Sequence, residues 1–128
     1  MSASDPSPTD PDLAGRHQAA LQRLIDEHTA GGTDPRRLRR ALALCRELAA
    51  SLDDEYCRRK VLVVEECAAE LFSTAEPRAR GNLSGVDFLR GRIREALELV
   101  QSRLYSLERA RRFGHPVPAR GLAARFAG

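Results

Sequence analysis

Aromatic side chains are scarce in this 128-residue chain: they make up 5% of it and include no tryptophan. The core must therefore be built from Leu, Ala, Val and Ile. A chain of this length supports one small domain with a single core, because folding removes only about two-thirds of its unfolded surface from water. The scarcity of aromatics also argues against a single-strand nucleic-acid binder, since such proteins stack bases on aromatic rings.

Long apolar runs are also missing, so the sequence predicts no membrane-spanning helix and no membrane partner. Residues 1–12 are acidic and proline-rich without a basic or apolar run, which is not the pattern of a secretory signal. The cysteines are odd in number and form no CxxC pair, which favours free thiols in a reducing compartment. They are Cys45, Cys57 and Cys67. We therefore expect a cytoplasmic protein of bacterial type.

Residues 1–12 are expected to be disordered, because Pro, Ser, Thr and Asp have little apolar surface to bury. A first helix is predicted from Leu13 to about Ala30, where apolar residues and two histidines recur at three- and four-residue steps. Gly31 and Gly32 are expected to end it. The recurring positions are His17, Ala20, Leu21, Leu24, Ile25 and His28.

Asp34 followed by Pro35 marks the start of a second helix, since Asp caps free amides and Pro fits the first turn. Its apolar stripe is Leu38, Ala41, Leu42, Cys45, Leu48, Ala49 and Leu52. A third helix is expected to begin at Ser51 as its cap, with three acids following in its first turn, and to end before Pro77. Its expected stripe is Tyr56, Lys60, Val63, Val64, Cys67, Leu71 and Phe72.

The junction between these two helices contains neither Gly nor Pro, so a single long helix over residues 35–76 is the alternative. We favour the hairpin, because two short antiparallel helices bury both stripes within one chain. A long helix would need a partner and would make the protein a dimer.

The last helix is expected to start at Asn82 or Ser84 and to run to about Phe113. Its apolar positions are Val86, Leu89, Ile93, Ala96, Leu97, Val100, Leu104 and Leu107. The sequence thus predicts an all-α fold: a four-helix bundle over residues 13–113, or a three-helix core with a looser first helix. Residues 114–128 are expected to form a flexible, basic C-terminal tail.

The sequence shows no set of residues typical of a catalytic or metal-binding site. The sequence contains no GxxxxGK[ST], GxGxxG or HExxH motif, and the cysteine spacing is unlike that of zinc ligands. We therefore expect no enzyme activity, no cofactor and no metal, and keep a thiol or metal module as the least favoured hypothesis. Cys57 is expected to be the most reactive thiol, because it lies near a helix start.

Charge is patterned along the chain, whose net charge is +3. Acids outnumber bases in residues 1–35 and 61–77, whereas bases outnumber acids in 36–60 and 78–128. The densest cluster is Arg36, Arg37, Arg39 and Arg40, placed where a helix dipole disfavours cations. It is either paired internally, with Asp34 and the acidic first helix, or a surface for phosphates or an acidic partner. On the second interpretation, Arg90 and Arg94, which lie one turn apart on the last helix, belong to the same basic surface.

The tail carries two apolar residues four positions apart, Leu122 and Phe126, beside Arg120 and Arg125. As a helix these would form a small face suited to a partner's groove, while the alternative is a frayed terminus. The leading hypothesis is a non-enzymatic protein–protein interaction module, such as an adaptor, secretion chaperone or regulator, and a homodimer is compatible with it. The second is a nucleic-acid-associated protein that contacts phosphates through Arg36, Arg37, Arg40, Arg90 and Arg94.

Overall fold

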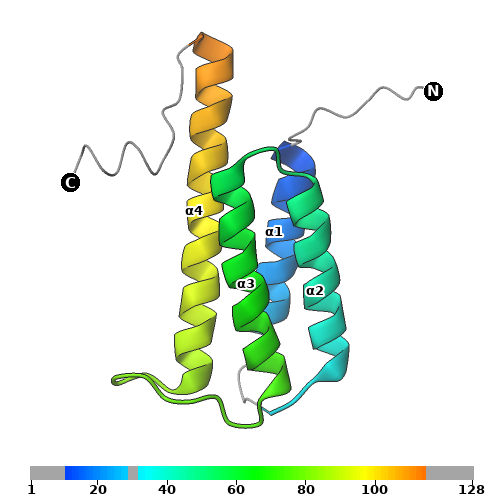
Figure 1. The fold of residues 1–128 in the computed structure, drawn as a ribbon, viewed down its shortest axis with the longest axis vertical. Coiled ribbons are helices and arrows are strands. Elements are labelled where there is room, and N and C mark those ends of the chain that lie inside the picture. The colour runs from blue at the N-terminus through cyan, green and yellow to red at the C-terminus, as the bar shows by residue number, and fades with distance from the viewer. Residues whose placement is uncertain (1–10, 29–31, 115–128) are drawn as a thin grey trace.

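The structure is a computed structural model that describes residues 11–28 and 32–114, and these form an antiparallel four-helix bundle (Figure 1). The helices are α1 (Pro11–Asp26), α2 (Pro35–Ala50), α3 (Glu55–Ser73) and α4 (Gly85–Phe113). The predicted all-α bundle is thereby confirmed. None of these described helices is both long and apolar enough to cross a bilayer.

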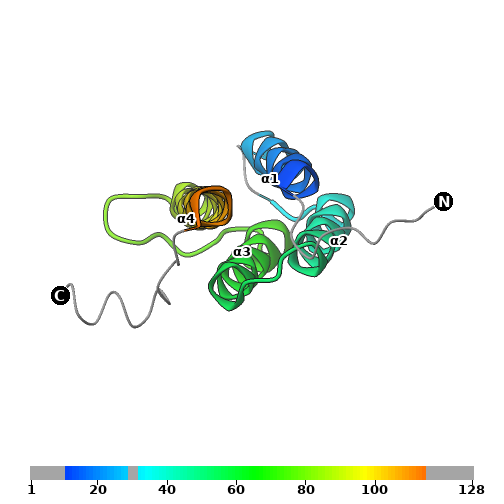
Figure 2. The same cartoon turned by 90° about the horizontal axis from the view of Figure 1, so that it is seen from above.

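Seen along its axis, the bundle has α2, α3 and α4 arranged around one side and α1 between α2 and α4 on the other (Figure 2). Among neighbouring helices, packing is most extensive between α3 and α4 and least extensive between α1 and α4. The core is aliphatic apart from Phe72, its largest fully buried side chain. Because Leu21 and Ile25 of α1 are completely buried, α1 is an integral part of the core rather than a loose addition.

The hairpin between α2 and α3 is confirmed, and the single long helix is wrong. The predicted cap of α3 is also wrong: Ser51 closes α2, with its Oγ donating to the carbonyl of Leu48 at 2.7 Å. Asp54 caps α3 instead, accepting a 3.1 Å hydrogen bond from the backbone N–H of Cys57. A carboxylate is favoured at this site because it also interacts with the positive end of the helix dipole.

The predicted buried stripe of α3 is confirmed at Val64, Cys67, Leu71 and Phe72, but in the first turns of the helix it is shifted by one residue. Cys57 and Val61 are buried, whereas Tyr56 and Lys60 lie at the rim of the core, with Lys60 Nζ 5.3 Å from the centre of the Tyr56 ring. The polar ends of Tyr and Lys favour a place from which they reach water, and the smaller apolar side chains fill the core in their stead.

α1 begins two residues earlier and ends four residues earlier than predicted. It includes Pro11, and its last residue is Asp26 rather than one just before Gly31. Two residues beyond the helix end, the His28 ring packs edge-on against Phe72, with ring centres 4.8 Å apart. His28 Nε2 also donates to the carbonyl of Gly32 at 3.1 Å.

Residues at each end of α4 explain where the helix begins and ends. Ser84 is the cap, and its Oγ accepts from the backbone N–H of Asp87 at 3.1 Å. Gly85 begins the helix so close to the preceding loop that a Cβ there would lie 2.0 Å from the carbonyl oxygen of Pro77. Gly114 ends it with a φ of +73°, which only glycine adopts without strain.

Candidate functional site

Two arginines of α4 converge on the carboxylate at the end of α1. Arg94 Nη2 lies 3.5 Å and Arg90 Nη2 lies 3.8 Å from Asp26 Oδ1, which also accepts a 2.8 Å hydrogen bond from Gln22. The negative end of the α1 dipole disfavours a carboxylate at this position, and the two guanidinium groups offset that effect. Arg90 and Arg94 are thus engaged in holding α4 against α1.

The four arginines at the start of α2 differ in their contacts. Arg37 turns toward α1, with Nη2 3.6 Å from Glu27 Oε1 and Nε 3.2 Å from Asp34 Oδ2. Its Nη1 donates to the carbonyl of Leu24 at 3.3 Å. The other three are exposed and form no ion pair within the part of the chain that the structure describes: Arg36, Arg39 and Arg40. Internal pairing therefore accounts for one arginine of the cluster.

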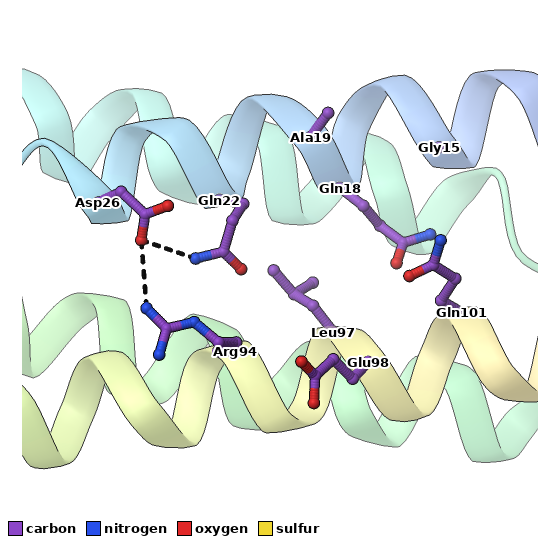
Figure 3. A pocket seen from close by; sticks show the side chains of 9 residues that line it. All are labelled: Gly15, Gln18, Ala19, Gln22, Asp26, Arg94, Leu97, Glu98 and Gln101. Carbon is purple, nitrogen blue, oxygen red and sulfur yellow. Dashed lines mark hydrogen bonds and ion pairs between the residues drawn. The ribbon is translucent and has the colours of Figure 1, made fainter.

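A groove of about 370 Å³ lies between α1 and α4 (Figure 3), which pack less extensively than the other neighbouring helices. On the α1 side the small residues Gly15 and Ala19 leave this space open, and Leu97 of α4 forms an apolar patch in it. Its remaining walls are polar, with three glutamine amides, one arginine and two carboxylates. These residues are Gln18, Gln22, Gln101, Arg94, Asp26 and Glu98.

Above this groove α4 continues past the rest of the bundle (Figure 1). It has 29 residues, and its last buried residue is Leu104. Beyond it Tyr105 and Phe113 are 63% and 56% exposed. Between them the guanidinium carbon of Arg109 lies 5.8 Å from the centre of the Tyr105 ring and 5.3 Å from that of Phe113. Residues 105–113, which we call the projecting end of α4, thus carry an exposed Tyr and an exposed Phe with Arg109 between them, while Leu107 packs partly against the core.

The base of this projecting end is anchored to the α2–α3 turn. Arg103 donates to Asp54 through Nη2 at 3.0 Å and Nε at 3.2 Å, and both side chains are largely buried. Burial opposes ionisation of the Asp54 carboxyl, but hydrogen bonds from Arg103 and from Cys57 outweigh it and hold its pKa below the ordinary 3.8. This forked ion pair links α4 to the residue that caps α3, at the point where α4 leaves the bundle.

The expectation that Cys57 is a reactive thiol is wrong. It is completely buried, and its burial, followed by the nearby Asp54 carboxylate, raises the thiol pKa to about 12. Burial likewise raises the pKa of Cys45 to about 12 and that of Cys67 above its ordinary value. A helix start lowers a thiol pKa only where the sulfur is accessible to solvent or cations, and here it faces the core.

Metal binding by the cysteines is the other hypothesis on which the structure bears. Among the described residues, no three His, Cys, Asp or Glu side chains are grouped so that they could hold a metal ion. The three cysteines are separate, free and buried, which is the usual environment of a thiol that acts as a small apolar side chain.

The predicted contact residues of the tail lie outside the described residues: Arg120, Leu122, Arg125 and Phe126. Sequence reasoning missed Tyr105 and Phe113 as candidates. Their spacing of four residues on either side of Arg109 was the available signal, because residues four apart share a helix face. How far the neighbouring helices extend along that face depends on how the helices pack against one another, which periodicity does not report.

Comparison of the chain with models of protein families, with curated proteins and with solved structures finds no match.

Proposed function

We propose that this protein is a non-enzymatic, helical protein–protein interaction module whose docking element is the projecting end of α4. The observation that supports this most is the exposure of Tyr105 and Phe113 on a helix end that contributes no buried residue after Leu104. These residues do not stabilise the core, so their exposure is explained by contact with another molecule.

The chemistry of this helix end suits a protein partner. Tyr and Arg are among the side chains that contribute most to binding at protein interfaces, and aromatic residues are enriched there. Arg109 lies near both rings, and this contact favours one arrangement of the three side chains before binding. The cations of this end, Arg109, Arg111 and Arg112, favour a partner surface with acidic side chains.

The anchor formed by Arg103 and Asp54 supports the same role. Because the pair is buried and forked, it holds α4 rigidly at the point where the helix leaves the bundle. A rigid helix presents its side chains without a further ordering cost on binding. An adaptor, a secretion chaperone or a regulator would use such an element, and the three buried free thiols favour a cytoplasmic location.

The test is affinity purification from the native cell with the full-length chain as bait. We expect a specific partner to be retained by the wild type and lost with the Tyr105→Ser/Phe113→Ser double variant. Leu62→Ser is the matched control, because Leu62 of α3 is also 56% exposed but lies outside the projecting end. Equal partner binding by all three proteins contradicts the proposal. Deleting residues 115–128 reports separately on the tail.

A second candidate function is phosphate contact by nucleic-acid binding, favoured by Arg36, Arg39 and Arg40, which are exposed and form no ion pair with the described residues. Titration of labelled DNA and RNA at two salt concentrations tests it, because each phosphate contact contributes about 0.9 to the log–log salt slope on duplex DNA. Changing these three to Gln should lower the slope, whereas the control Arg58→Gln/Arg59→Gln/Lys60→Gln should not. Absence of binding at low salt contradicts this function.

A further inference from the structure

An outward-facing stripe on α4 runs from the groove to the projecting end. It consists of Glu98, Tyr105 and Arg112, each exposed and each seven residues from the next. Side chains seven apart lie on one face of a helix, two turns from each other. We call these three residues the outer stripe of α4.

The outer stripe is complementary to itself. Tyr105 lies at its centre, with a carboxylate two turns before it and a guanidinium two turns after it. If a second copy of α4 is laid antiparallel on the first with the two tyrosines opposed, Glu98 of each copy faces Arg112 of the other. An interface related by a twofold axis requires this arrangement, in which one patch is complementary to its own copy.

The charges of the outer stripe are available for such pairing. Glu98 forms no ion pair with any residue that the structure describes. Arg112 Nη2 lies 3.7 Å from Glu108 in its own helix, but both side chains reach solvent, 68% and 36% exposed. An exposed pair within one helix turn contributes little, so this contact competes weakly with a pair across an interface.

The shape of the molecule allows two copies to come together in this antiparallel arrangement. A twofold axis at Tyr105 places the two bundles on opposite sides of the contact, because the bundle ends where α4 begins to project (Figure 1). The projecting end of the second copy then lies along α4 beside residues 97–105. This stretch borders the groove between α1 and α4, where Glu98 and Gln101 form part of the wall (Figure 3).

We infer that two copies of this chain associate through the outer stripes of antiparallel α4 helices, with Tyr105 at the twofold axis and Glu98 of each copy paired with Arg112 of the other. This inference rests on the proposed function, since it identifies a second copy of the chain as a partner of the projecting end. The groove receives the end of the second copy's α4.

Light scattering and sedimentation of the full-length chain test it directly. We expect the wild type to have twice the monomer mass, and Glu98→Arg or Arg112→Glu to weaken dimerisation by roughly tenfold or more, because like charges then meet twice in the interface. Glu66→Arg and Arg39→Glu are controls, since each changes the net charge equally at an exposed position on another helix. Both controls should remain dimeric.

Mixing the two monomeric variants is the decisive measurement. In the mixture every side chain at position 98 faces the opposite charge at position 112 of the other variant, so an equimolar mixture should recover the dimer mass as a heterodimer. A wild type that is monomeric at high concentration overturns the inference, as does a mixture that remains monomeric. A monomeric wild type that still loses another protein partner on Tyr105→Ser/Phe113→Ser would refute the dimer and leave the proposed function intact.

Discussion

Arg103 of α4 forms a forked ion pair with Asp54, the residue that caps α3, with Nη2 3.0 Å from Oδ1 and Nε 3.2 Å from Oδ2. One carboxylate thereby links the start of α3, the α2–α3 turn and α4. This ion pair lies just before the projecting end of α4. The same two side chains therefore contribute to the stability of the fold and to the position of that helix end.

Removing the arginine of this pair should destabilise the protein strongly. In Arg103→Met the largely buried Asp54 carboxylate loses its counter-charge, and the free energy of unfolding should fall by about 3 kcal/mol. Urea denaturation followed by circular dichroism measures this. The double variant Asp54→Asn/Arg103→Met keeps a capping side chain without the buried charge and should recover part of the loss. A single variant within about 0.5 kcal/mol of the wild type would contradict the buried pair.

The same carboxyl should make stability depend on acid pH. Its folded-state pKa is lowered from the ordinary 3.8, because hydrogen bonds from Arg103 and Cys57 outweigh the effect of its burial. The stability it contributes is therefore complete above that ordinary value and is lost as pH falls below 3.8 through the lowered pKa. Urea denaturation across this range should show a smaller loss for Asp54→Asn than for the wild type. Parallel pH profiles for the two proteins would contradict the lowered pKa.

Two glycines of α4 should respond oppositely to the same substitution. Gly85→Ala places a Cβ 2.0 Å from the carbonyl oxygen of Pro77, so the loop must shift, and we expect a loss of about 1–3 kcal/mol in unfolding free energy. Gly91→Ala meets nothing within 4 Å and should stabilise the helix by roughly 0.5–1 kcal/mol. Melting temperatures of both variants give the comparison. A neutral Gly85→Ala would show that the loop does not approach the helix this closely.

The three thiols should resist modification in the folded protein. All are buried, and the pKa of both Cys45 and Cys57 is raised to about 12, so almost no thiolate is present at neutral pH. Treatment with iodoacetamide followed by intact-mass measurement should find alkylation only after urea is added. Rapid alkylation of Cys57 without denaturant would restore the view that its position near a helix start makes it reactive.

Local signals in the sequence predicted helix boundaries well where one residue supplied the cause. Asp34 and Ser84 cap α2 and α4, and Phe113 ends α4 before Gly114 adopts its left-handed conformation. Prediction failed where a distant residue decided the outcome. α1 ends at Asp26, and His28 then packs against Phe72, a contact with α3 that no periodicity within residues 13–30 reports.

The candidate site was predicted less completely than the fold, for the same reason. The arginine cluster of α2 was visible as a cluster, but its division into Arg37 and three exposed arginines depends on where Glu27 lies. The projecting end of α4 is a property of the whole bundle, since it depends on how far the other helices extend along α4, and Tyr105 is exposed on the outward face of this helix.

By itself the sequence determined the four helices and most of their caps, because periodicity and capping act between residues three or four positions apart. Only the tertiary structure decided which charges are paired between helices. Arg103 meets Asp54 across 49 positions and Arg94 meets Asp26 across 68. Such pairs form only after the bundle has brought the helices together, and the same packing leaves Glu98, Tyr105 and Arg112 facing outward.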